Sequence, residues 1–148
     1  MNEQEKAVIQ EALAILDRHM KEPGVALTAP GLVRAYLRLK LERREAEVFA
    51  VIFMDNQHRV IEFVEMFQGT IDSASVYPRE VVKKALQLNA AACILTHNHP
   101  SGISEPSQAD IMLTRRLKES LALVDIRVLD HLVVGKAEIT SLSERGLI

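Results

Sequence analysis

The sequence has a single cysteine, no tryptophan and few aromatic residues, with two tyrosines and four phenylalanines among 148 residues. One cysteine excludes an internal disulfide and a structural zinc site built from several thiolates. Cys93 lies in the apolar run Ala91-Ala92-Cys93-Ile94-Leu95, so we expect a buried, unreactive side chain rather than a catalytic thiol. The scarcity of aromatic rings argues against a surface that binds single-stranded nucleic acid by base stacking.

The sequence also lacks an excess of charge of one sign and any long apolar run. Lys and Arg number 18 and Asp and Glu number 20, a net charge of -2, which argues against a broadly basic surface that coats DNA. The first nineteen residues carry acidic side chains and no sustained apolar stretch, so they resemble neither a signal peptide nor a membrane span. We expect a soluble, cytoplasmic protein with no membrane contact, whose oligomeric state the sequence does not indicate.

Apolar periodicity and turn residues predict strands that alternate irregularly with helices, in one α/β or α+β sheet domain. The predicted helices cover 3–20, Thr28 (as N-cap) to about Glu45, about Arg79 to Asn89, and Ser107 to about Leu123. The predicted strands are Val48–Met54, Val60–Phe67, Ala91–Thr96, Ile126–Val134 and Glu138–Leu142, the first two forming a hairpin. The inward face of the third helix is expected to carry Val81, Val82, Ala85, Leu86 and Leu88.

The candidate catalytic and metal-binding residues are concentrated in the segment 96–110. His97 and His99 are two positions apart at the end of a predicted strand, so both imidazoles point to the same side. Neutral imidazole is a good zinc ligand. Because two neighbouring histidines also occur by chance in surface loops, this pair alone does not establish a metal site.

Ser107 and Asp110 lie one turn apart at the start of the next predicted helix. A serine N-cap with an acidic residue three positions later is typical of a capping box. The same spacing places a hydroxyl and a carboxylate side by side, and the short loop 100–106 can return them to the histidines. Three ligands, His97, His99 and Asp110, would leave the fourth tetrahedral position open, as in catalytic zinc sites.

A hydrolase of this kind also needs a general base and a donor aimed at the developing oxyanion. Ser107 can supply the donor. Glu47 directly precedes the predicted buried strand Val48–Met54 and is a candidate base, with Glu62 and Glu65 on the following strand as alternatives. Spacing alone does not choose among the three, and Glu47 also fits an exposed charge after a charged helix.

The spacing His-x-His, seven residues, Ser-x-x-Asp at His97, His99, Ser107 and Asp110 resembles the JAMM metal motif. Four further stretches are similar to the RadC-like branch of the JAB/MPN (JAMM) metalloprotease superfamily: Tyr77-Pro78-Arg79-Glu80, Asn98-His99-Pro100-Ser101-Gly102, Glu105-Pro106-Ser107 and Leu129-Asp130-His131. The family's upstream glutamate lies in a Glu-aromatic-apolar run, which Glu47-Val48-Phe49-Ala50 resembles. The likeness extends from about residue 28 to the C-terminus.

This resemblance implies a cytidine-deaminase-like JAB/MPN domain over 28–148, with a central mixed β-sheet flanked by helices, after an N-terminal helical segment, 1–27. It implies one zinc ion per chain bound by His97, His99 and Asp110, with Glu47 activating water and Ser107 steadying the oxyanion. The implied activity is that of a zinc-dependent peptidase or isopeptidase acting on a peptide or protein. Larger RadC-like proteins carry an N-terminal helix-hairpin-helix module, so the chain resembles a shortened form.

Two other functions can be compared with this one. A nucleobase deaminase needs His-x-Glu and Pro-Cys-x-x-Cys, which a single cysteine excludes. A non-catalytic metal-binding accessory module, associated with DNA repair or protein interaction, stays open; basic residues within 34–44 and Arg115-Arg116-Lys118 are its sequence support. His/Asp ligands also accept iron or manganese. His131 is expected to be a histidine of the core or sheet face rather than a fourth ligand.

Overall fold

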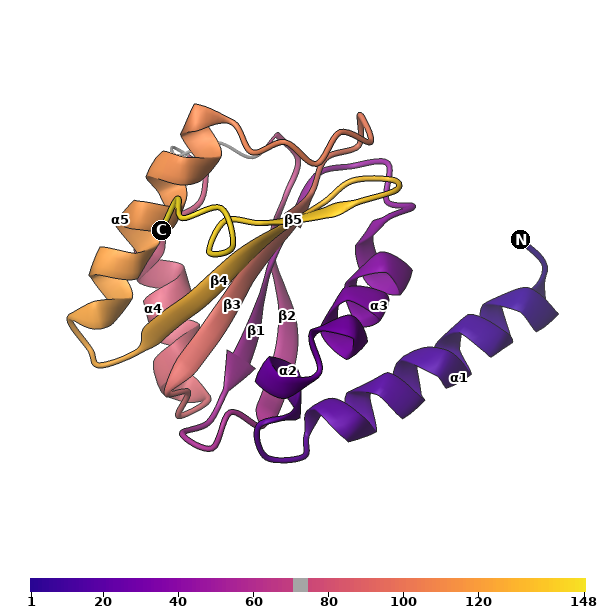
Figure 1. Cartoon of the computed structure of the whole chain (residues 1–148), viewed down its shortest axis with the longest axis horizontal. Helices are drawn as coiled ribbons and strands as arrows, with labels where there is room; N and C mark the ends of the chain where they lie inside the picture. Colours follow the sequence, from indigo (N-terminus) through magenta and orange to yellow (C-terminus); the bar gives the residue numbers. More distant parts are fainter. Residues whose placement is uncertain (71–74) are drawn as a thin grey trace.

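The computed structural model describes residues 1–70 and 75–148 (Figure 1). Its helices are α1 (Glu3–Met20), α2 (Val25–Thr28), α3 (Pro30–Leu41), α4 (Pro78–Gln87) and α5 (Gln108–Ala122). Its strands are β1 (Val48–Met54), β2 (Val60–Gln68), β3 (Ala92–Asn98), β4 (Arg127–Val134) and β5 (Ile139–Ser141). The predicted mixed α/β architecture is therefore confirmed.

The five strands form one mixed sheet in the order β2-β1-β3-β4-β5. β1 and β2 pair antiparallel, as the predicted hairpin requires, and β1 also pairs antiparallel with β3. β3 and β4 are parallel, and α5 makes the crossover between them. Every residue of β1 and of β3 is buried, which explains the continuous apolar sequence of β1 and the apolar start of β3.

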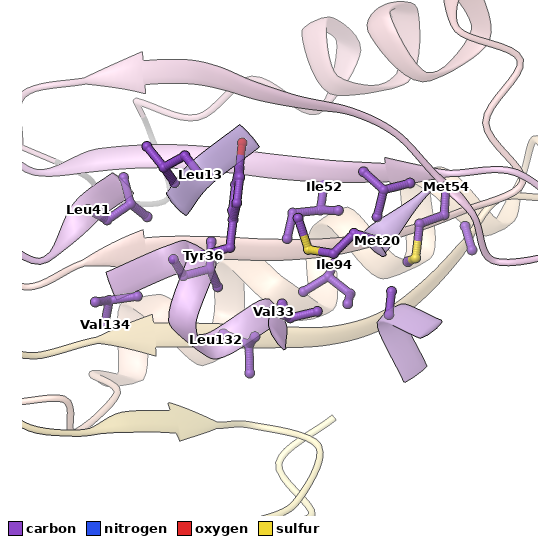
Figure 2. Packing of buried hydrophobic residues seen from close by; sticks show 14 of the residues in the cluster. Leu13, Met20, Val33, Tyr36, Leu41, Ile52, Met54, Ile94, Leu132 and Val134 are labelled. Atoms are coloured by element: carbon purple, nitrogen blue, oxygen red, sulfur yellow. The ribbon is translucent and has the colours of Figure 1, made fainter. Parts of the chain in front are cut away.

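Helices cover both faces of the sheet, with α1 and α3 on one side and α4 and α5 on the other (Figure 1). On the α1/α3 side, Leu13, Met20 and Val33 pack with Ile52 and other strand residues (Figure 2). On the α4/α5 side, a second cluster joins Phe49, Val51 and Phe53 of β1 to Val81, Ala85, Leu113 and Leu117 of the helices. Alternate residues of β1 thus belong to different cores, as the period of two in a strand requires.

The predicted helix from Thr28 to Glu45 is wrong at both ends. Thr28 is the last residue of α2, and its hydroxyl donates to the Gly24 carbonyl at 3.0 Å instead of capping α3. Ala29 takes the N-cap position with φ -126° and ψ 67° and no side-chain cap, because the following proline disfavours the helical conformation there. At the other end α3 stops at Leu41, and the chain leaves the helix to enter β1.

The sequence-based prediction that Leu86 of α4 faces inward is also wrong. Leu86 is 52% exposed, whereas Val81 and Ala85, four positions apart, are buried against the sheet. A helix advances 100° per residue, so Leu86 follows Ala85 out of the buried stripe.

Two basic residues of α3 form hydrogen bonds with the C-terminal part of the protein. Arg34 donates to the Ile139 carbonyl at 2.9 Å and pairs with Glu144 at 3.1 Å. Arg38 donates to the Ala137 carbonyl at 3.5 Å. These contacts hold α3 against β5 and the turn before it. In the described part of the chain, no helix has both the length and the apolar composition that a membrane crossing needs.

The pairing register brings the segments of interest to one edge of the sheet. Phe49 near the start of β1 is opposite His97 near the end of β3, and Val133 near the end of β4 is opposite His97 on the other side. The residues just before β1 and just after β3 and β4 therefore lie at the same edge, although they are far apart in sequence.

Candidate metal centre

His97 is a fully buried histidine near the end of β3. Its ring stacks on the ring of its cross-strand neighbour Phe49, with centroids 6.5 Å apart and planes inclined by 23°. The edge of the ring reaches toward the first turn of α5, where Nε2 lies 3.2 Å from a carboxylate oxygen of Asp110. A histidine in so apolar a strand needs polar partners at both nitrogens, and both are present.

His99 lies one residue beyond β3 and faces the same side as His97, as the two-residue spacing predicts. The two Nε2 atoms are 3.0 Å apart. Asp110 contacts both rings: its Oδ1 lies 3.2 Å from Nε2 of His97, and its Oδ2 lies 3.2 Å from Nε2 of His99. The structure thus brings together His97, His99 and Asp110.

Asp110 is fixed by the capping box that the sequence predicts at the start of α5. The Ser107 hydroxyl accepts a hydrogen bond from the Asp110 amide at 3.0 Å, and the Ser107 amide donates to Asp110 Oδ2 at 2.8 Å. The capping box and the approach to the histidines therefore coexist, because Oδ2 faces the Ser107 amide and His99 at once. The helix N-terminus adds a favourable field for the carboxylate.

Glu47, half-buried, immediately precedes β1 and completes the cluster. One ligand atom each from Glu47, His97 and His99 lies within 4.8 Å of the others, a grouping that can hold a metal ion. Of the two alternative bases, Glu65 pairs with Arg44 at 3.0 Å and Glu62 is opposite Phe53 toward the far end of β1. Among the residues that the structure describes, the group that can hold a metal ion includes Glu47 but neither Glu62 nor Glu65.

Asn98, a residue that the sequence analysis did not single out, ties the segment around Glu47 to β3. Its Oδ1 accepts the Val48 amide at 2.7 Å, and its Nδ2 donates to the carbonyls of Arg44 and Ala46 at 3.3 and 3.1 Å. This buried side chain satisfies three backbone groups on both sides of Glu47. In the sequence Asn98 stands between the two histidines and begins the stretch Asn98–Gly102 that resembles the RadC-like branch, and neither feature reveals a backbone clamp.

The hydrogen bond at Nδ1 of His99 determines which ring nitrogen presents a lone pair to the cluster. Nδ1 lies 2.8 Å from the Ile103 carbonyl, which can only accept, so Nδ1 carries the hydrogen. In the neutral ring Nε2 then has no hydrogen and points a lone pair toward His97 and Asp110. Nitrogen and carboxylate lone pairs at one point need a positive charge between them, which a metal ion or a proton on His99 can supply.

The spacing of these atoms fits a bound cation. Zinc binds imidazole nitrogen and carboxylate oxygen at about 2.0–2.2 Å, so neighbouring ligand atoms in a tetrahedral site lie about 3.3 Å apart. The two Nε2 atoms are 3.0 Å apart, and each lies 3.2 Å from a different oxygen of the Asp110 carboxylate. Two imidazoles and a carboxylate are also a donor set that zinc and other first-row divalent ions accept.

The pKa values around the cluster reflect the same contacts. The hydrogen bond to Asp110 raises the pKa of His99 and outweighs burial, which would lower it. Burial alone would raise the pKa of Asp110, but His97 and His99, which donate to its carboxylate when their rings are protonated, hold that pKa well below its usual range. Asp110 is therefore ionised at neutral pH, as a metal ligand must be.

Behind His97 lies a second polar pair that the sequence analysis did not connect to the site. His131 on β4 is fully buried, with Nε2 2.7 Å from Nδ1 of His97 and Nδ1 2.5 Å from the Thr114 hydroxyl on α5. Burial holds the pKa of His131 well below its ordinary value, so the ring is neutral. His131 is thus a core histidine, as expected, and it touches His97 from behind.

Comparison with known proteins agrees with this arrangement of fold and motif. Residues 27–147 match the family described as the RadC-like JAB domain. The chain belongs to this RadC-like JAB domain family. The match covers all five strands and the whole cluster of Glu47, His97, His99, Ser107 and Asp110, and it confirms the RadC-like resemblance.

Curated relatives of the RadC-like chain carry the name UPF0758 protein. One from Cellvibrio japonicus is 62% identical over 141 residues, which are 93% of this chain and 63% of the relative. One from Marinobacter nauticus is 58% identical over 145 residues, 96% of this chain and 65% of the relative. The chain therefore spans slightly less than two thirds of the length of these relatives, whose name states no activity.

Proposed function

We propose that this RadC-like domain is a zinc-dependent hydrolase that cleaves an amide bond in a peptide or protein substrate. The observation that carries the proposal is the convergence of His97, His99 and Asp110 within 3.0–3.2 Å of one another, with the Glu47 carboxylate alongside the histidines. A cluster that served only to hold a metal for structural reasons would need a closed ligand set and no additional carboxylate.

The ligands in this proposal are His97, His99 and Asp110, and Glu47 is the general base. Asp110 is assigned as the ligand because both of its oxygens face the histidine nitrogens and Ser107 fixes one of them. A divalent cation held there would polarise a substrate carbonyl and lower the pKa of a bound water. Glu47 would accept a proton from the attacking water and give it to the departing amine.

Ser107 is proposed as the oxyanion donor. Its hydroxyl oxygen accepts the Asp110 amide hydrogen, and that bond does not use the hydroxyl's own hydrogen. The hydrogen can therefore be donated to an oxygen that develops negative charge beside Asp110. In this role one side chain caps α5 and stabilises the transition state.

The deciding experiment compares bound metal and amide hydrolysis in the wild type, His97→Ala, Asp110→Asn and Glu47→Gln. We expect about one zinc per wild-type chain by elemental analysis, and little in the first two variants. Glu47→Gln should keep the zinc and lose roughly 10²–10⁴-fold in hydrolysis of any substrate found in a peptide-library screen. Circular dichroism checks that each variant is folded.

Two results would count against the proposal in different ways. Loss of zinc from Glu47→Gln, with zinc retained by Asp110→Asn, would exchange the roles of the two carboxylates. Absence of metal from the wild type after incubation with zinc would rule out the proposed hydrolase activity and favour a role as an accessory module. DNA binding that weakens steeply with salt and survives His97→Ala would then identify a nucleic-acid partner.

A further inference from the structure

A chain of buried hydrogen bonds leads from the first turn of α5 through β4 to His97. Thr114 donates its hydroxyl hydrogen to the Asp110 carbonyl at 2.7 Å. The Thr114 oxygen lies 2.5 Å from Nδ1 of His131, and Nε2 of His131 lies 2.7 Å from Nδ1 of His97. All three side chains are 0% exposed, so water does not replace any of these partners.

The direction of each bond in this chain is determined by its first link. The Asp110 carbonyl can only accept, so the single hydroxyl hydrogen of Thr114 is committed to it. The Thr114 oxygen must then accept from Nδ1–H of His131. A neutral His131 with its hydrogen on Nδ1 has a lone pair on Nε2, which accepts from Nδ1–H of His97. The Nε2 of His97 is left as a lone pair that faces His99 and Asp110.

We propose that Thr114 and His131 are positioning residues that fix the tautomer of His97 and thereby direct its Nε2 lone pair to the metal position. The proposal rests on the proposed function in one respect, that a cation is bound at that position. Its statement about the tautomer of His97 concerns the metal-free protein as well.

Packing around His131 supports a positioning role. The Phe49 ring lies edge-on to His131 at 5.8 Å and 90° and stacks on His97 at 6.5 Å, so a single aromatic ring restricts both imidazoles. The series of hydrogen bonds also starts at the backbone carbonyl of Asp110, the residue that supplies the carboxylate. A metal-ligating histidine commonly donates its other N–H to such a partner, and loss of the partner typically weakens metal binding about 10–100-fold.

The test uses Thr114→Val, which removes the hydroxyl at nearly constant volume, with Thr114→Ser as the matched control that keeps it. In metal-free wild type and Thr114→Ser, long-range ¹H–¹⁵N spectra should show the hydrogen of His97 on Nδ1. In Thr114→Val, His131 loses its acceptor and can donate through Nε2, so we expect a mixture of the two His97 tautomers. Zinc affinity, measured by competition with a chromophoric chelator, should fall about tenfold in Thr114→Val and less than threefold in Thr114→Ser.

The outcomes separate this proposal from the proposed function. An unchanged His97 tautomer and unchanged zinc affinity in a folded Thr114→Val would overturn the positioning role while leaving the metal site intact. A wild type that binds no zinc, but whose His97 carries Nδ1–H only while the Thr114 hydroxyl is present, would support the positioning role and refute the proposed function. His131→Leu is a second variant, whose apolar side chain makes no hydrogen bond to Thr114 or His97 and which should weaken zinc binding at least as much.

Discussion

A single hydroxyl, that of Ser107, is involved in both the stability of α5 and the proposed chemistry. Ser107→Ala removes the acceptor of the Asp110 amide and should lower the free energy of unfolding of the metal-free protein by about 1 kcal/mol. It should also lower the turnover of the zinc-loaded protein by about 10²–10³-fold, as the loss of an oxyanion donor does. Urea denaturation and a kinetic assay measure the two effects separately.

Ser107→Thr is the matched control for both effects, because it retains the hydroxyl. It should restore most of the stability and part of the turnover. Equal turnover in the alanine variant and the wild type would restrict Ser107 to capping, and an unchanged free energy of unfolding would show that the Asp110 amide finds another acceptor.

Cys93 gives the protein a pH-dependent stability that is independent of any metal. Burial raises the pKa of its thiol from 9.0 to about 12, so above pH 9 the unfolded chain releases a proton that the folded protein keeps. The folded state then binds more protons than the unfolded state, and its stability falls as pH rises, by about 1.4 kcal/mol per pH unit between 9 and 12.

Cys93→Ala isolates this contribution, because the variant lacks the thiol. The free energy of unfolding, measured in urea between pH 8 and 10.5, should decline less steeply in the variant than in the wild type. Parallel curves for the two proteins would show that the thiol of the folded protein titrates as in the unfolded chain.

At this scale the sequence supports some assignments and leaves others open. The capping box of Ser107 and Asp110 is local, within one turn of helix, so the sequence predicts it. The choice of Glu47 over Glu62 and Glu65 depends on which end of β1 lies beside the histidine end of β3. This is a non-local pairing that spacing alone does not determine. The partnership of Thr114 and His131 joins residues 17 positions apart on two elements and has no sequence signature.

At the scale of elements, β1 was predicted at both ends, because it is buried on both faces and its apolar run is continuous. β3 extends two residues beyond the predicted end at Thr96, because the polar residues His97 and Asn98 are buried in the sheet as well. The boundary of α3 was predicted poorly, because Thr28 is a good N-cap residue by type, yet the restriction on the residue before Pro30 moves the helix start past it. Two local preferences disagree at that point, and the restriction before proline prevails over the N-cap preference of threonine.

The pairing of β1 with β3 depends on Asn98 where it meets the site. Asn98→Ala would leave the buried Val48 amide and the carbonyls of Arg44 and Ala46 without their partner, so we expect a loss of stability of about 2–3 kcal/mol. The segment that carries Glu47 should also move relative to the histidines. Turnover should therefore fall more than zinc affinity, since Glu47 is the proposed base and the ligands lie elsewhere.

Asn98→Asp separates the two halves of this clamp. An aspartate keeps the acceptor for Val48 and loses both donors, so its stability should lie between those of the wild type and Asn98→Ala. Equal losses of zinc affinity and turnover in Asn98→Ala would indicate that Asn98 supports the metal ligands rather than the placement of Glu47.

On the scale of the whole molecule, the sheet separates two large hydrophobic clusters, and the helix that carries Asp110 packs on one of them. α5 carries Ser107 and Asp110 at its start and packs through Leu113 and Leu117 on the same core as Phe49. α1 and α3 pack on the opposite face, where Met20 and Val33 belong to the same cluster as Ile52 (Figure 2). Stability and metal binding should therefore respond differently to cavities made on the two faces.

Met20→Ala and Leu117→Ala test this separation, since both side chains are at most 1% exposed. Each truncation should cost about 2–5 kcal/mol, measured by urea denaturation of the metal-free proteins. Zinc affinity should be nearly unchanged in Met20→Ala, because effects at distant sites are close to independent. It should fall measurably in Leu117→Ala, because α5 sets the position of the Asp110 carboxylate, and ligand geometry tolerates shifts of only about 0.5 Å. Equal zinc affinity in the two variants would mean that the loop and β3 hold the ligands without help from α5.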